Sequence, residues 1–237
     1  MSNPFHFKQF KVHQDQAAMK VGTDGVLLGA WTQINDTVNS ILDIGSGTGL
    51  ISLMMAQRCY VENIDAVELN EEAYVQTVDN FEQSDWGDRL FCYHASFQEF
   101  SNEMDEKYDL IISNPPFYTS TYKELSEDRA MARHSESLSY NELLKGTSKL
   151  ISIQGSCAFI IPYDEEDNFI NIAEKYKLYP NKITRVKGTE NSVIKRSLLQ
   201  FSFVENPIER TELVIEIERH TYTSEYIALV KDFYLKM

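Results

Sequence analysis

The sequence predicts an α/β fold: one domain over residues 1–237, with a mostly parallel sheet of about seven strands and helices on both faces. From residue 41 onward, short apolar runs alternate with helical patterns, which is typical of βαβ units. A glycine-rich stretch from Asp43 to Gly49 separates an apolar run from a helical pattern. The segment Asn114 to Phe117 follows a later apolar run, so both motifs should lie at carboxyl ends of strands, where α/β sheets bind ligands.

The expected elements follow from hydrophobic spacing and turn residues, in chain order. Residues 5–12 should form a small hairpin, and Thr23 or Asp24 should cap a short apolar helix that ends at Trp31. Residues 1–39 together are expected to be an N-terminal extension that acts as a lid. The remaining strands are expected over 40–44, 63–67, 90–93, 108–113, 157–161, 178–186 and 194–204, the last two as an antiparallel pair. The remaining helices are expected over 50–58, 71–83, 139–150 and 165–176.

Composition excludes several classes of protein. No apolar run approaches the roughly 20 residues that span a bilayer, and no secretory signal is visible, so we expect a cytoplasmic protein. The three cysteines and five histidines show no metal-ligand spacing, so no metal site is expected.

The net charge of −14 argues against general affinity for nucleic acid, because the whole-molecule attraction to phosphate is absent. One stretch departs from this balance: residues 182–196 hold five cations against one carboxylate, a local charge of +4. It is either a phosphate-facing patch or the solvated face of a strand pair. Its cations are Lys182, Arg185, Lys187, Lys195 and Arg196.

The glycine stretch is expected to be a cofactor loop. Glycines permit a tight turn and a close backbone approach to a ligand at a helix N-terminus. A dinucleotide fingerprint needs a third glycine where Leu50 stands, and no Gly-Lys-Ser/Thr of a phosphate-binding loop follows. Glu68 ends the next strand 19 residues after Gly49, a distance suited to a carboxylate that accepts the hydroxyl protons of a ribose.

The motif from Asp43 to Gly49 resembles motif I of the class I S-adenosylmethionine-dependent methyltransferases. The resemblance implies their Rossmann-like seven-stranded sheet with one antiparallel strand, and S-adenosylmethionine as the methyl donor. It also implies that Glu68 holds the ribose and that Ser96 and Phe97 lie at the adenine, although an Asp is more usual at Ser96. The donor-binding residues expected on this basis are Thr23, Asp43, Gly45, Ser46, Gly47, Gly49, Glu68, Leu69, Ser96, Phe97 and Asn114.

The tetrapeptide Asn-Pro-Pro-Phe suits methylation of an exocyclic amino nitrogen, whose delocalised lone pair makes it a poor nucleophile. The Asn114 side-chain oxygen and the Pro115 carbonyl can accept the two amino hydrogens, while the prolines hold these acceptors rigid. Phe117 can stack on a planar target. No dedicated base is required, because the methylated nitrogen is acidic enough to lose its proton to water.

Relatives with this tetrapeptide methylate adenine, guanine or cytosine amino groups, or the glutamine amide of peptide release factors. Only 42 residues precede Asp43, too few for the helical substrate domain of the glutamine enzymes, and residues after Phe117 are needed for the sheet rather than for DNA target recognition. A compact RNA enzyme is therefore expected. Methylation of guanine N2 in ribosomal RNA or of a protein amide stays as an alternative, as does a non-catalytic binder.

A closer resemblance is to the bacterial tRNA adenine-N6 methyltransferases that modify adenine 37 of a valine tRNA. It is carried by residues 7–10, 19–31, 133–134 and 226–236. It implies that the target adenine turns out of the anticodon loop into the pocket and stacks on Phe117. The residues expected to meet RNA or to border the base are Lys20, Arg129, Arg133, His134, Lys182, Arg185, Lys195 and Arg196. The oligomeric state and any protein partner are not predicted.

Overall fold

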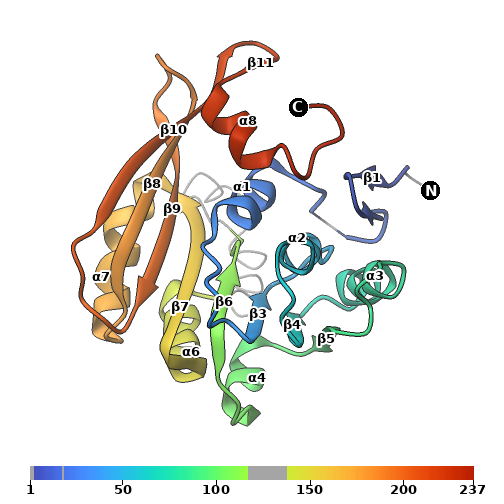
Figure 1. Ribbon diagram of the computed structural model, residues 1–237. Coiled ribbons are helices and arrows are strands. Elements are labelled where there is room, and N and C mark those ends of the chain that lie inside the picture. The colour runs from blue at the N-terminus through green and yellow to red at the C-terminus, as the bar shows by residue number, and fades with distance from the viewer. Residues whose placement is uncertain (1–2, 18, 117–137) are drawn as a thin grey trace, which may run out of the picture.

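The computed structural model describes residues 3–17, 19–116 and 138–237 (Figure 1). Its central feature is a nine-stranded sheet in the order β11-β10-β8-β9-β7-β6-β3-β4-β5. The bounds are β3 (Ser40–Ile44), β4 (Asn63–Glu68), β5 (Leu90–His94), β6 (Tyr108–Ser113), β7 (Ile151–Pro162), β8 (Tyr179–Thr189), β9 (Ile194–Ser202), β10 (Glu209–Glu218) and β11 (Thr221–Tyr222). Strand β9 runs antiparallel to both neighbours, and β11 runs antiparallel to β10, while the other paired strands are parallel.

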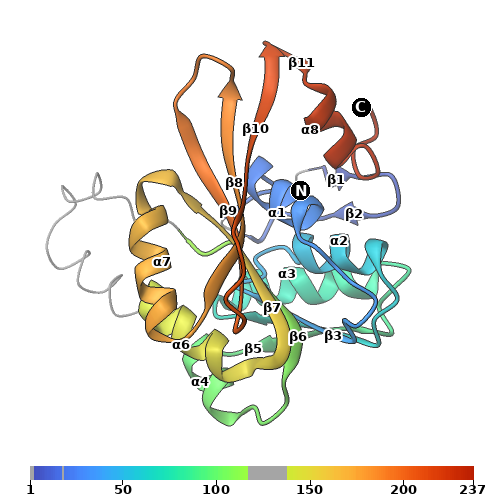
Figure 2. The same ribbon diagram turned by 60° about the vertical axis from the view of Figure 1, so that its left-hand side comes forward.

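Helices cover both faces of this sheet, as Figure 2 shows. They are α1 (Thr23–Trp31), α2 (Leu50–Arg58), α3 (Glu71–Glu82), α4 (Phe97–Glu103), α6 (Tyr140–Leu150), α7 (Glu166–Lys175) and α8 (Ser224–Val230), with a 3₁₀ turn over Tyr163–Glu165. Alternate residues of β6 serve opposite cores: Leu110 and Ile112 pack with α1 and α2, whereas Ile111 packs with α4, α6 and α7. This period of two explains why the centre of the strand, residues 110–112, is apolar on both faces.

The predicted α/β class and the predicted elements after residue 40 are confirmed, with boundary differences of up to three residues except at β7, which begins six residues before its predicted start. Two strands were not expected: β10 and β11 extend the seven-stranded core beyond β8. Helices α4 and α8 were also not expected. The start of α4 could have been recognised in the sequence, because Ser96 and Glu99 form a capping box at its first turn.

The N-terminal segment folds as the predicted hairpin, β1 (Phe5–His6) with β2 (Lys11–Val12), and it packs against the C-terminal segment. Phe7 forms an isolated bridge with Tyr234, and their rings lie 5.8 Å apart. The expected side-chain cap of α1 is wrong. Gly22 occupies the N-cap position without a side-chain hydrogen bond, and Asp24 accepts instead from Arg196 Nε at 2.8 Å. No helix of the described ranges is long and apolar enough to cross a membrane.

Candidate active site

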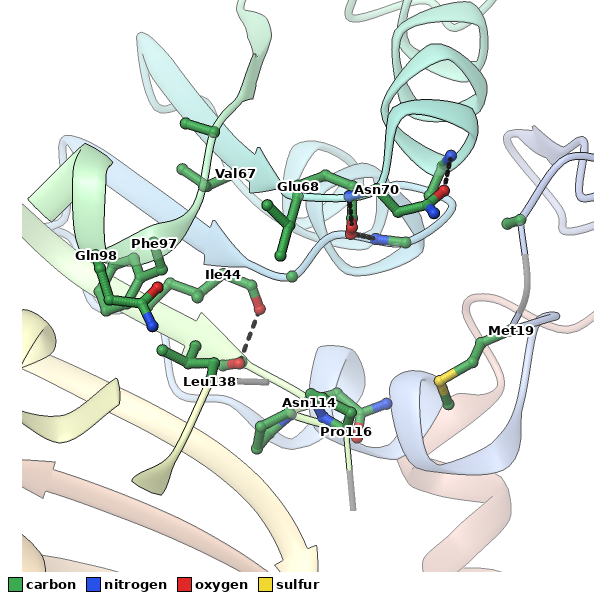
Figure 3. Close-up of a pocket in the computed structure, with 18 residues that line it drawn as sticks. Met19, Ile44, Val67, Glu68, Asn70, Phe97, Gln98, Asn114, Pro116 and Leu138 are labelled. Atoms are coloured by element: carbon green, nitrogen blue, oxygen red, sulfur yellow. Dashed lines mark hydrogen bonds between the residues drawn. The ribbon is translucent and has the colours of Figure 1, made fainter. Parts of the chain in front are cut away.

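A cavity of about 270 Å³ lies at the carboxyl ends of β3, β4 and β6, where the two sequence motifs meet (Figure 3). Parallel strands place their following loops at one edge of the sheet, so residues distant in the chain share this cavity. Its lining includes Ala17, Met19, Gly45, Gly47, Glu68, Leu69, Asn70, Ala95, Phe97, Gln98, Ser113, Asn114, Pro115, Pro116 and Leu138.

The glycine loop has a backbone that only glycine adopts readily. Gly45, Gly47 and Gly49 have φ angles of 72°, 59° and 75°. A Cβ atom at Gly45 or Gly47 would meet nothing within 4 Å, so this backbone is open to a ligand. Gly49 differs, because a Cβ there would lie 2.6 Å from Phe81 Cε1. Gly45 and Gly47 therefore leave the loop backbone accessible, and Gly49 allows the loop to pack closely against α3.

Two backbone hydrogen bonds hold the carboxylate of Glu68, which lines the cavity. Its Oε2 accepts a hydrogen bond from Gly47 N at 2.9 Å, and its Oε1 accepts one from Asn70 N at the same distance. Asn70 in turn caps α3 by accepting from Ala73 N. Each carboxylate oxygen keeps a further lone pair, so Glu68 can still accept from two hydroxyl groups of a ligand.

Asn114 carries an unmet hydrogen-bonding capacity. Its Oδ1 is buried and has no hydrogen-bond partner in the described part of the chain. The preceding Ser113 donates to Ile44 O at 2.8 Å, which ties the end of β6 to the end of β3 and fixes where Asn114 begins. A buried carbonyl oxygen without a partner costs free energy, and such orphans mark binding sites for donors.

The segment before α1 reaches the cavity, and we call its residues 13–17 and 19 the strap. Asn80 of α3 holds it: Asn80 Oδ1 accepts from His13 N, and Asn80 Nδ2 donates to His13 O and to Thr48 O, at 2.8–2.9 Å. Ala17 and Met19 thereby line the cavity. One buried amide therefore positions the strap and the glycine loop together. The lid role predicted for residues 1–39 stays a prediction.

Several predicted donor-binding residues have other contacts. Asp43 is buried below the loop and accepts from Ser52 N and Oγ, which holds the start of α2. Burial raises the pKa of this carboxyl to about 7, against the effect of the Ser52 hydrogen bonds. Ser46 is also buried, and its Oγ lies 3.3 Å from Thr77 Oγ1.

Ser96 and Thr23 are not among the lining residues either. The Ser96 hydroxyl donates to Glu99 Oε2 at 2.7 Å and accepts from Glu99 N, so the capping box engages it. Phe97 and Gln98 line the cavity beside it. Thr23 is exposed at the start of α1 and lines a separate hollow.

Five of the cations predicted to meet RNA are described, and three of these five are engaged within the protein. Arg185 Nη2 lies 2.7 Å from buried Glu166, and Arg196 Nε lies 2.8 Å from Asp24. Lys182 Nζ lies 5.1 Å from the centroid of the Trp31 ring. Lys195 and Lys20 are exposed. Residues 182–196 lie on the strand pair β8 and β9, and much of their positive charge is paired within the protein. The strand-pair interpretation therefore explains this stretch better than a phosphate-facing patch does.

The remaining predicted site residues, Phe117, Arg129, Arg133 and His134, lie outside the described residues. Among those that are described, no group of His, Cys, Asp and Glu could hold a metal ion. Sequence reasoning missed Met19, Gln98 and Leu138 as lining residues. Gln98 could have been found, because it follows Phe97 at the expected adenine contact. Met19 and Leu138 carry no chemical signal, and only the folded chain brings them to the cavity.

Comparison with known proteins gives consistent matches along the chain. The model of the Methyltransferase small domain family matches residues 21–141. A tRNA1(Val) (adenine(37)-N6)-methyltransferase of Christiangramia forsetii is 58% identical over all of both chains. Proteins of the same name are 46% identical in Bacteroides fragilis, over all of both chains, and 43% identical in Trichodesmium erythraeum, over 99% of this chain and 98% of the relative.

Solved structures support the fold alone, because their sequences are distant. The crystal structure of a predicted O-methyltransferase from Agrobacterium tumefaciens has a TM-score of 0.68 at 16% identity and covers 89% of this chain and 96% of its own. TYW2 of P. horikoshii in complex with MeSAdo has a TM-score of 0.58 at 13% identity, over 84% of this chain and 70% of its own.

Proposed function

Because this chain belongs to the family of tRNA1(Val) (adenine(37)-N6)-methyltransferases, we propose that it transfers a methyl group from S-adenosylmethionine to N6 of adenine 37 in the anticodon loop of that tRNA. The observation that carries this proposal is the buried Oδ1 of Asn114 beside the glycine loop, which has no hydrogen-bond partner among the described residues. It is the hydrogen-bond acceptor that an exocyclic amino group requires.

The residues at the cavity fit S-adenosylmethionine, which when bound supplies an activated methyl group on a sulfonium. The open backbone of Gly45 and Gly47 admits a ligand chain close to the loop. Glu68, held by Gly47 N and Asn70 N, has lone pairs for the ribose hydroxyls. Phe97 and Gln98 line the same cavity, and they supply an apolar face and an amide, which an adenine ring could use. Asp43 and Ser46 support the loop through hydrogen bonds to Ser52 and Thr77.

Asn114 and Pro115 prepare the acceptor. Asn114 Oδ1 accepts one amino hydrogen, and the Pro115 carbonyl accepts the other, which directs the nitrogen lone pair toward the donor. Neither proline can donate a backbone hydrogen bond, and both restrict the chain, so these acceptors are rigid. Methylation forms the N–C bond as the donor's S–C bond breaks. The nitrogen then loses a proton to water, so no side chain need act as a base.

A chain of net charge −14 should bind RNA with little help from long-range attraction. An adenine in an anticodon loop suits such an enzyme, because a loop base costs less to turn outward than a paired one. The contacts of Phe117, Arg129, Arg133 and His134 with this base or its phosphates stay predictions. An enzyme that acts on tRNA works where tRNA is, so the cytoplasmic location also stays a prediction.

The test incubates the purified protein with labelled S-adenosylmethionine and with undermodified total tRNA, ribosomal RNA or release factors, and maps products by mass spectrometry. We expect N6-methyladenine at position 37 of the valine tRNA. Label in ribosomal guanine or in a protein amide, with none in tRNA, would overturn the proposal.

Asn114→Ala tests the role of the orphaned oxygen. We expect donor affinity within about twofold of wild type and turnover reduced by at least about 100-fold, the scale seen for loss of one transition-state hydrogen bond. Asn63→Ala is the matched control, because Asn63 is exposed at the amino end of β4. Undiminished turnover in Asn114→Ala would refute the assigned role.

A further inference from the structure

A second hollow, of about 750 Å³, has a lining rich in aromatic rings, and we call it the aromatic hollow. Segments far apart in the chain build it: β1, the residues that lead into α1, the end of β8, β10, β11, α8 and the C-terminal residues. Its lining includes Phe5, His6, Val21, Gly22, Thr23, Gly188, Ile215, Glu216, Tyr222, Tyr226, Tyr234, Leu235, Lys236 and Met237. Figure 1 shows the C-terminal segment and α8 at the same end of the molecule as α1.

The aromatic side chains of this hollow form two pairs. The rings of Tyr222 and Tyr226 lie 5.3 Å apart with a 40° angle between their planes, and those of Phe5 and Tyr234 lie 6.1 Å apart at 65°. Tyr226 is buried, whereas the other three are half-buried and keep accessible surface. Burial raises the pKa of Tyr226 and of Tyr234, so these phenols stay neutral and present no negative charge to a ligand.

The aromatic hollow lies close to the catalytic cavity. Met19 lines the cavity and Val21 lines the hollow, so their Cα atoms are at most about 7 Å apart along the chain. Lys20 is exposed between them, and Lys236 lines the hollow itself. An RNA loop whose target adenine enters the cavity would therefore have a neighbouring nucleotide within reach of the hollow.

We propose that the aromatic hollow stacks an unpaired base that flanks the target adenine in the RNA loop; this inference rests on the proposed function. Unpaired bases are recognised by aromatic stacking, which needs no positive charge. Unlike a typical basic RNA-binding protein, this chain has a net charge that repels phosphate, and several of its cations are paired with carboxylates. Stacking of a base in the aromatic hollow, beside Lys20 and Lys236, supplies affinity for RNA that the overall charge of the protein does not supply.

The test uses an anticodon stem-loop RNA with 2-aminopurine substituted, one position at a time, for each base flanking the target. Binding to the wild-type protein should quench the fluorescence at one of these positions, because 2-aminopurine dims when it stacks on an aromatic ring. Tyr222→Ala should restore that fluorescence and raise the dissociation constant for the RNA by about 5- to 150-fold, the range of one base–aromatic stack. Donor affinity should not change.

Two variants serve as controls. Tyr222→Phe keeps the ring and should retain both quenching and affinity, whereas Tyr60→Ala removes a fully exposed ring far from the hollow in the sequence and should behave as wild type. Unquenched fluorescence at every flanking position, or wild-type RNA affinity in Tyr222→Ala, would overturn the inference. Failure of the proposed function is distinguishable, because the wild-type protein would then methylate no tRNA.

Discussion

Replacing Gly49 by alanine should destabilise the protein through two separable effects at the base of the glycine loop. The first is conformational: with φ at 75°, an added Cβ costs about 1–2 kcal/mol. The second is steric, because that Cβ would lie 2.6 Å from Phe81 Cε1 and 3.2 Å from Thr77 Cγ2. Phe81 is 2% exposed, so its ring has little room to move. Overpacking of this kind costs about 1–3 kcal/mol, which makes the expected total about 2–5 kcal/mol.

Gly45→Ala separates the two effects. Gly45 has φ 72°, but nothing lies within 4 Å of the Cβ that alanine would add, so only the conformational cost should apply. Urea denaturation at 25 °C should show Gly49→Ala losing about 1–3 kcal/mol more of its unfolding free energy than Gly45→Ala does. Equal losses in the two variants would refute the steric reasoning. Combining Gly49→Ala with Phe81→Leu should recover part of the loss, because the two positions are in contact.

Three further predictions concern buried polar groups. Because Asp43 titrates near 7 in the folded protein and near 3.8 unfolded, its contribution is present below about pH 4 and is lost as pH rises through 7, by roughly 4 kcal/mol at most. Unfolding free energies at pH 5–8 should thus fall less steeply in Asp43→Asn than in wild type, and parallel curves would contradict this. Asn80→Ala should cost about 1–3 kcal/mol and speed hydrogen exchange of the strap, with weaker donor binding by calorimetry; unchanged exchange would exclude Asn80 as its anchor. Arg185→Met leaves buried Glu166 without its cation and should cost roughly 3 kcal/mol in denaturant titrations, whereas a loss below about 1 kcal/mol would mean that the pair is dispensable.

The strand and helix pattern was readable from the chain because burial imposes local periodicity. Strands β3 and β6 and helix α2 have the bounds that apolar spacing predicts. Strand β10 escaped detection because its sequence, Glu-Arg-Thr-Glu-Leu-Val-Ile-Glu-Ile-Glu, is charged at both ends and its middle is only partly buried. Its place beside β8 depends on pairing with a strand about 27 residues earlier, such as Arg210 with Ile183, and local composition does not encode that contact.

The candidate site likewise has some features that follow from local sequence and others that depend on distant contacts. Gly45, Gly47, Glu68 and Asn114 were predicted from the sequence as site residues, and all four line the cavity, because each stands at or just after the carboxyl end of a strand. The contacts of other polar residues near the motifs could not be predicted. Ser96 and Asp43 have the right chemistry for a ligand, yet helix capping and the start of α2 engage them.

The sequence by itself determined the fold class and the positions of the two motifs at strand ends, because these depend on residue type and local spacing. Only the tertiary structure decided which groups meet: the strap beside the cavity, the carboxylate partners of the cations, and the aromatic hollow built from both ends of the chain. Such contacts join residues as distant as Lys8 and Lys231, which are 223 positions apart, and arise only when burial brings distant segments together. The residue type thus fixes what a side chain can do chemically, whereas the tertiary structure decides which groups it contacts.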